Sequence, residues 1–208
     1  MEAVLSLIRH GQTQCTVEGR FCGGHEGELT GIGQETGVYA GRHPALEDVG
    51  LVVSSPSRRA LLTAEKIAAA KAAHLVVDDR LSELSFGEWE DRLPSEVDRH
   101  SLRRWESDPA LFSPPGGETG LEVMARSVAA VRDAAQRARS VAVVTHKAPI
   151  RLVLSFFLGL PPSRYRELGG ITVGSVTRLE LRGGRATLTA LGDVSHLPPA
   201  WRSDTHRG

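Results

Sequence analysis

The stretch Val4–Thr13, VLSLIRHGQT, begins as an apolar run and ends with Arg9, His10 and Gly11. A continuous apolar run of this length is typical of a strand that is buried on both faces of a parallel sheet. Two polar side chains directly after such a strand need a reason, because burying them costs free energy. Other strands of this chain end in a similar way.

Further apolar runs predict the partners of this strand. Val49–Ser55 and Ser140–His146 are rich in valine and predict buried strands, and His74–Leu81 predicts another. Ser175–Leu191 contains two alternating runs around a Gly-Gly pair, which predicts a β-hairpin. The sheet therefore combines parallel strands with an antiparallel edge.

Helical patterns separate these strands. The predicted helices cover Gln34–Arg42, Arg58–Ala73, a stretch that begins after Thr119, and Pro149–Leu160. Thr119 and Glu122 form a capping-box pair at the start of the third helix. Its apolar residues recur at intervals of three and four, which predicts one buried stripe of Leu121, Met124, Val128, Val131, Ala135 and Ala138. The glycine-rich segment Gly19–Gly33 is expected to be a loop.

The alternation of strands and helices predicts an α/β fold. We expect a three-layer α/β/α sandwich with a mostly parallel central sheet and an antiparallel edge. A chain of 208 residues can bury one good core, so we expect a single domain over residues 1–208. The irregular segment at about 84–118 is expected to be a variable, cap-like insertion in that domain.

The composition limits the functional classes. Lys and Arg together number 25, as do Asp and Glu, which argues against a dominant surface for nucleic acid or for a membrane. No apolar run approaches the ~20 residues of a membrane span, and the N-terminus lacks the pattern of a signal peptide. We therefore expect a cytoplasmic protein. Cys15 and Cys22 are expected to be reduced thiols, with a smaller chance that one of them reports on redox state.

Polar residues follow the predicted strands at their carboxyl ends. The first strand leads to Arg9 and His10, the second to Arg58 and Arg59, and the strand at Ser140 to His146 and Lys147. Each of these groups alone has an ordinary structural interpretation, such as a solvated edge or the first turn of a helix. Ligands of open α/β sheets bind at this edge, so the coincidence of all three predicts a local cationic pocket for an anion.

These motifs resemble those of the histidine phosphatase superfamily, the phosphoglycerate-mutase-like proteins. The similar segments follow one another along nearly the whole chain: LIRHGQT at Leu7–Thr13, LTGIG at Leu29–Gly33, SSPSRRALLTA at Ser54–Ala64, LSELSFGEWE at Leu81–Glu90, PPGGET at Pro114–Thr119, THKAPIR at Thr145–Arg151 and GDVSHL at Gly192–Leu197. The resemblance implies a phosphoglycerate-mutase-like fold and a reaction in which a histidine is transiently phosphorylated.

The resemblance also implies roles for five residues. His10 is expected to be the nucleophile, and Arg9 and Arg59 to bind the phosphate, because a guanidinium can hold two phosphate oxygens and stays charged. His146 is expected to contact the phosphoryl oxygens and, if protonated, to offset charge in the transition state. Glu83 matches the acid that protonates the leaving group, and burial beside Leu84 and Phe86 is expected to raise its pKa. Arg58 is expected to lie outside the pocket.

Five further residues are expected near the substrate. Gln12 and Thr13 follow the nucleophile, and the loop that contains Gly23 offers backbone N–H groups to an anion or is simply a surface loop. Two positions depart from the family pattern. Thr16 stands where many relatives have asparagine, so a phosphate contact is lost or is made by a hydroxyl. Lys147 stands where many have glycine, and its side chain either binds a second anionic group of the substrate or points to solvent.

A phosphatase is the favoured function, acting on a small phosphorylated metabolite through phosphohistidine. The alternative is phosphoryl transfer of the phosphoglycerate mutase type, although only Glu90–Ser113 fills the interval in which such mutases carry a longer insertion. A non-catalytic module that binds a phosphorylated ligand is the third possible function.

We expect no metal and no cofactor, because no acidic cluster or histidine spacing suits one. The sequence does not identify the substrate, and a homodimer stays open. Several residues of the variable segment are expected to lie either on an exposed helix or at the rim of the pocket: Arg92, Arg99, Arg103, Arg104 and Trp105.

Overall fold

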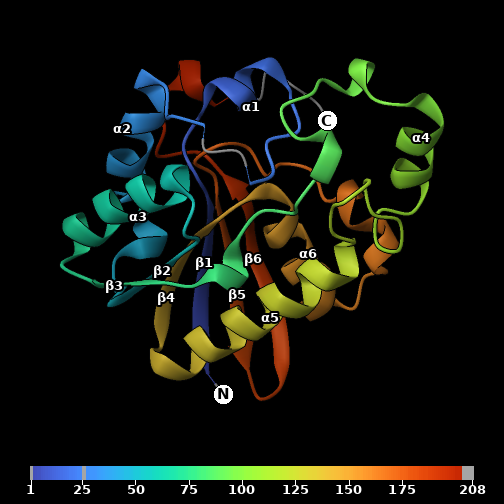
Figure 1. The fold of residues 1–208 in the computed structure, drawn as a ribbon. Coiled ribbons are helices and arrows are strands. Elements are labelled where there is room, and N and C mark those ends of the chain that lie inside the picture. The colour runs from blue at the N-terminus through green and yellow to red at the C-terminus, as the bar shows by residue number, and fades with distance from the viewer. Residues whose placement is uncertain (1, 25–26, 203–208) are drawn as a thin grey trace.

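A mixed six-stranded sheet forms the centre of the molecule, with helices on both faces (Figure 1). The computed structural model describes residues 2–24 and 27–202. The strand order is β3-β2-β4-β1-β5-β6. The strands are β1 Ala3–Arg9, β2 Leu51–Ser54, β3 His74–Val77, β4 Ser140–Thr145, β5 Val176–Arg182 and β6 Arg185–Asp193. The first four are parallel to one another, and β5 and β6 form the antiparallel edge. The predicted fold class is confirmed.

Alternating side chains of the central strands build a core on each face of the sheet. On β1, Leu5 and Leu7 pack in the cluster that includes residues of α5 (Gly120–Arg137) and α6 (Lys147–Leu158). Ile8 packs on the other face, with residues of α2 (Gly31–Ala40) and α3 (Arg58–Lys71). Because successive strand residues point to opposite faces, this split explains why the runs are continuously apolar.

The closing hairpin has the turn that its sequence predicts. Gly183 and Gly184 both have positive φ, at 56° and 79°, which is the backbone that a type I′ turn needs. β5 pairs antiparallel with β1, so the hairpin covers the edge of the parallel strands.

The helices differ in part from the prediction. The predicted loop Gly19–Gly33 ends earlier than expected, because Thr30 caps α2 and its hydroxyl accepts a hydrogen bond from Gly33 N at 3.1 Å. A short helix, α1 (Gln14–Glu18), forms directly after the motif and was not predicted. The capping box of α5 is present, with Thr119 as N-cap. Within the predicted stripe of that helix, Leu121 is instead exposed, and Gly120 and Val123 are the buried residues of the first turn.

The prediction of reduced cysteines is wrong. Cys15 and Cys22 form a disulfide with a Cα–Cα distance of 5.9 Å. Their short separation in sequence suggested no useful crosslink, but α1 and the turn after it bring the two residues together. Gly19 ends that helix in the left-handed region at φ 73°, which reverses the chain toward Cys22.

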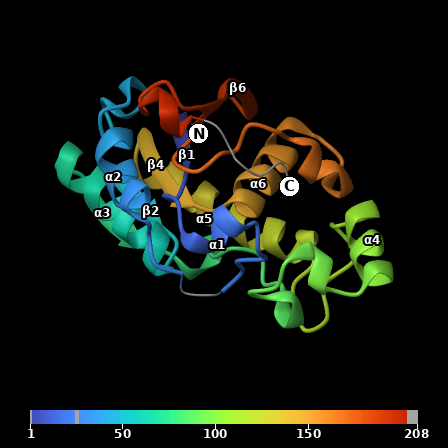
Figure 2. The ribbon, with the colours of Figure 1, turned by 90° about the horizontal axis from the view of Figure 1, so that it is seen from above.

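The segment at about 84–118 folds beside the sheet, where α4 (Arg99–Ser107) lies on the far side of α6 from α2 and α3 (Figure 2). A cluster of four apolar side chains holds it against the loop after α1: Phe21, Trp89, Val97 and Trp105. The single-domain organisation with this segment as an insertion stays a prediction. In the described part of the chain, no helix has the length and apolar character to cross a membrane.

Candidate active site

The register of the sheet places the carboxyl ends of β1, β2 and β4 next to one another at the same edge. Arg9 pairs with Thr145, and Ser54 pairs with Val144. The backbone N–H of His10 donates to the carbonyl of Thr145 at 3.0 Å. The residues that follow β1, β2 and β4 therefore meet at the same edge, as the sequence predicted for parallel strands.

His10 is buried, and its contacts define which nitrogen carries the proton. Nδ1 lies 2.7 Å from the carbonyl oxygen of Gly11, which can only accept, so Nδ1–H is the donor in the neutral ring. Nε2 then keeps its lone pair and accepts from Arg59 Nε at 3.3 Å. Burial and the charges of Arg59 and Arg9 hold the pKa of His10 well below its ordinary value. The imidazole is therefore neutral at pH 7.

Arg59 connects the two histidines of the site. It lies on α3 with an exposed fraction of 1%. Its Nη2 donates to the Gly23 carbonyl at 2.8 Å and lies 3.3 Å from His146 Nδ1. The ring centroids of His10 and His146 are 5.0 Å apart. The neighbouring Arg58 is exposed, as predicted.

His146 is fully buried and is oriented by serines. Its Nε2 lies 2.8 Å from Ser55 Oγ and 3.2 Å from Ser57 Oγ. Burial, followed by the charge of Arg59, lowers the pKa of His146 well below its ordinary value. The neutral ring that accepts from Arg59 at Nδ1 carries its proton on Nε2 and donates it to Ser55. Without an anion, the site thus favours the neutral form of His146 and not the protonated form considered from the sequence.

Close backbone packing explains the glycine after His10. A Cβ on Gly11 would overlap the carbonyl oxygen of Gly33 at the start of α2. The Gly11 N–H donates to Thr63 Oγ1 at 3.1 Å, and that hydroxyl donates to Arg59 O at 2.8 Å. Thr63 therefore ties the loop after His10 to the helix that carries Arg59.

Glu83 reaches the amino end of α6. Its Oε1 accepts from Leu84 N at 2.9 Å and from Ala148 N at 3.3 Å. Arg126 on α5 fixes the segment that carries it, because its guanidinium donates to Glu83 O at 2.9 Å and pairs with Glu118 at 2.8 Å. Arg126 was missed in the sequence, although Glu118 belongs to the PPGGET motif that was noted there.

The residues expected near the substrate divide into two groups. Gln12 and Thr13 do not line the cavity described below, because Gln12 Oε1 accepts from Thr30 and the Thr13 hydroxyl accepts from Thr16 N. Gly23 lies behind Arg59, where a Cβ would overlap the Glu90 carboxylate. Thr16 lines the cavity, although its hydroxyl donates to the Thr13 carbonyl at 2.8 Å. Residues 25 and 26 of the glycine-rich loop lie outside the described residues.

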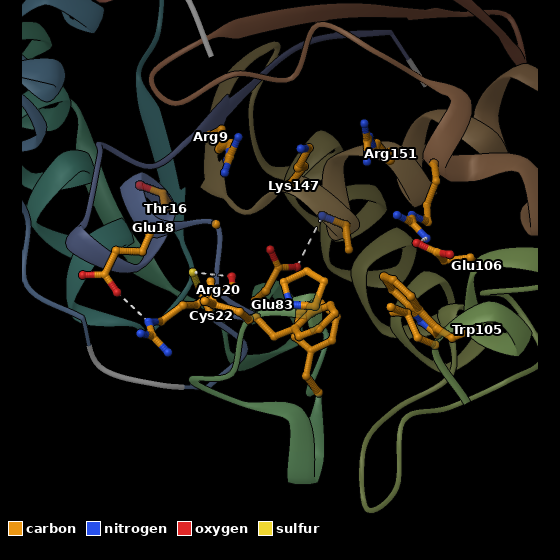
Figure 3. Close-up of a pocket in the computed structure, with 18 of the residues that line it drawn as sticks. Arg9, Thr16, Glu18, Arg20, Cys22, Glu83, Trp105, Glu106, Lys147 and Arg151 are labelled. Atoms are coloured by element: carbon orange, nitrogen blue, oxygen red, sulfur yellow. Dashed lines mark hydrogen bonds and ion pairs between the residues drawn. The ribbon is translucent and has the colours of Figure 1, made fainter. Parts of the chain in front are cut away.

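A cavity of about 620 Å³ extends from His10 toward the variable segment. Arg9, Lys147 and Arg151 lie in a row on one side of it, and Glu83 and Arg20 lie on the other (Figure 3). Of the residues expected at a rim in the variable segment, Trp105 lines the cavity and the four arginines do not. The lining residues that sequence reasoning missed include Arg151, Tyr165 and Arg166. Arg151 stands in the THKAPIR motif, but no motif marked the other two.

Among residues 2–24 and 27–202, no group of three or more His, Cys, Asp and Glu side chains is arranged to hold a metal ion. The polar groups that meet at His10 are instead guanidinium, imidazole and hydroxyl groups, together with one carboxylate, Glu83. This set suits an oxyanion such as phosphate.

The depressed pKa values of the two histidines predict a pH dependence. We expect ¹⁵N NMR of the histidine rings to show His10 and His146 neutral from pH 8 to below 6.5, with the proton of His10 on Nδ1. The unfolded chain takes up protons at these residues below about pH 6.5 while the folded chain does not, so the free energy of unfolding should fall as the pH decreases through that range. A titration midpoint of either ring at 6.5 or above would contradict the assignment.

Curated relatives share most of the chain. A glucosyl-3-phosphoglycerate phosphatase from Mycolicibacterium vanbaalenii is 32% identical over 190 residues, which cover 86% of this chain and 84% of that protein. Phosphoserine phosphatase 1 from Hydrogenobacter thermophilus is 29% identical over 199 residues, with 93% of each chain covered. Among solved structures, YhfR from Bacillus stearothermophilus superposes with a TM-score of 0.86 and 30% identity, covering 94% of this chain and 100% of that one.

The family model of the histidine phosphatase superfamily (branch 1) matches residues 5–194. This match includes all three strand ends of the site and the segment that carries Glu83. The chain therefore belongs to the histidine phosphatase superfamily.

Proposed function

We propose that this protein hydrolyses the phosphate monoester of a small metabolite, with His10 as the nucleophile. One observation carries the proposal: a buried, neutral imidazole holds its Nε2 lone pair toward a buried guanidinium, that of Arg59. A nucleophile and a phosphate-binding cation thus face the same point. The phosphatase names of the curated relatives support hydrolysis as the reaction.

In the first step, the arginines and histidines receive the phosphate. Arg9 and Arg59 supply guanidinium groups, and the charge of the bound dianion favours a proton on His146. His10 Nε2 then attacks phosphorus while the ester oxygen leaves, so one N–P bond forms and one P–O bond breaks. The cationic groups stabilise the charge that spreads over the phosphoryl oxygens.

Glu83 handles the proton of the leaving group. In the protonated form it donates that proton to the departing alkoxide, and the alcohol diffuses away. As a carboxylate it then takes a proton from the water that attacks phosphohistidine. This second step releases inorganic phosphate and restores both neutral His10 and protonated Glu83, so the cycle closes without a cofactor.

The sequence also predicts alternatives for the reaction, the location and the oligomeric state. Mutase-type transfer is the alternative outcome of the same phosphohistidine, and a binding module would need no competent nucleophile. A cytoplasmic location and a homodimer stay predictions.

Hydrolysis is tested by product analysis in H₂¹⁸O with a panel of phosphomonoesters. We expect one ¹⁸O atom in the released inorganic phosphate, and a loss of at least 10³-fold in kcat/KM for His10→Ala because the covalent route is closed. His74→Ala, which removes an exposed histidine on β3, is the matched control and should keep full activity. Transfer of the phosphoryl group to another hydroxyl, or an active His10→Ala variant, would contradict the proposal.

The role of Glu83 predicts a dependence on the leaving group. Glu83→Gln should lower kcat/KM by about 10²-fold or more for an alkyl phosphate, whose alkoxide needs a proton, and far less for p-nitrophenyl phosphate. Steady-state assays of both esters measure the difference. Glu88→Gln, on an exposed glutamate five residues further on, serves as the control. An equal loss with both esters would assign Glu83 another role.

A further inference from the structure

The cavity is much larger than a phosphate group. Its volume of about 620 Å³ is in the range of small-molecule sites, and His10 and Arg9 both line it. Aromatic rings line another part of it: Phe21 and Phe86 have centroids 4.8 Å apart, and Trp105, which lies away from Arg9 (Figure 3), is edge-on to both. This part of the cavity is therefore available to the group esterified to the phosphate.

One wall of that cavity is cationic. Lys147 is the first residue of α6 and Arg151 lies four residues later, so both side chains project from the same face of the helix. Both line the cavity, and Arg9 lines it from the end of β1 (Figure 3). The start of α6 lies directly after His146, so Lys147 is next to the phosphate end and Arg151 about 6 Å further along the helix axis.

The charged residues on the other elements that line the cavity form pairs of opposite charge or stack on an aromatic ring. Arg20 pairs with Glu18, and Arg166 lies 4.0 Å from Glu106 and stacks on Trp105 at 4.2 Å. Glu83 faces the amino end of α6 through its bond from Ala148 N. Glu18 and Glu106 thus pair with arginines on other elements, and Glu83 adds a negative charge that acts on Arg151.

Arg151 keeps its charge in an unusually buried position. Its exposed fraction is 7%, and its Nε donates to the carbonyl of Leu168 at 2.7 Å. Burial, with the nearby charges of Arg9 and Arg166, lowers its pKa to about 10. The guanidinium is still protonated at pH 7, and like charges around it raise the positive potential of this wall. An anion on the substrate would relieve that repulsion.

From this arrangement we infer that Lys147 and Arg151 form a subsite for a second anionic group, so that the substrates are phosphate monoesters with a carboxylate or a further phosphate on the esterified part. The inference rests on the proposed function and specifies its substrate class. Lys147 is the specificity-determining residue, because it stands nearest to the phosphate end.

Pairs of esters that differ in one group test the subsite. The carboxylate arm compares 3-phosphoglycerate with glycerol 3-phosphate, and the phosphate arm compares 1,3-propanediol bisphosphate with 3-hydroxypropyl phosphate. In at least one arm, we expect the wild-type kcat/KM to favour the ester with the second anionic group by tenfold or more. The arm that shows the preference identifies the anionic group.

Variants of Lys147 assign the preference to this residue. Lys147→Gln should reduce the kcat/KM ratio of the preferred pair by at least fivefold, mainly through KM, and Lys147→Arg should retain most of it. Arg185→Gln, which removes an exposed charge at the far hairpin, should leave the ratio unchanged. Thermal unfolding of each variant checks that the fold is intact.

The contrary results are distinct. Equal kcat/KM within both pairs, or a ratio that Lys147→Gln leaves unchanged because it lowers both members alike, would overturn the subsite while the phosphatase activity stands. No turnover of any of these esters or of p-nitrophenyl phosphate would overturn the proposed function and the subsite with it.

Discussion

The arrangement of the site depends on one buried guanidinium. Arg59 is almost completely covered, yet it donates toward both His10 and His146 and toward a backbone carbonyl. Burial, followed by the charge of Arg59, disfavours protons on the two imidazoles beside it, so both rings are neutral in the site without an anion. In the proposed reaction the same cation binds the phosphate. The position of Arg59 therefore influences both the orientation and the protonation state of the two histidines.

The sheet makes that position possible. Parallel pairing fixes Arg9 opposite Thr145 and Ser54 opposite Val144, so the residues after three strands meet without long-range adjustment. Close packing of backbone at Gly11 and Gly33 holds the loop after His10 against α2. The chemistry is placed on the rigid part of the fold, while the segment at about 84–118 shapes the cavity beyond it.

Sequence reasoning succeeded where chemistry follows from local pattern. Apolar runs predicted the strands, and the side chains after them predicted which residues meet, because parallel strands end at a common edge. Sequence reasoning failed for contacts that depend on the path of a loop or that join residues far apart in the sequence. The disulfide of Cys15 and Cys22 needs α1 to reverse the chain, and Arg126 reaches Glu83 from another layer. Tyr165 and Arg166 approach the cavity from a 3₁₀ turn that carries no motif.

We propose that Nε2 of His10 attacks phosphorus because Nδ1 is committed to the carbonyl of Gly11. The most direct measurement is to quench turnover in alkali, which preserves phosphohistidine, and to locate the phosphoryl group by peptide mapping and by ³¹P–¹⁵N coupling. We expect phosphorus on Nε2 of His10. Phosphorus on Nδ1, on His146 or on any other residue, or the absence of a phosphorylated enzyme during rapid turnover, would contradict it.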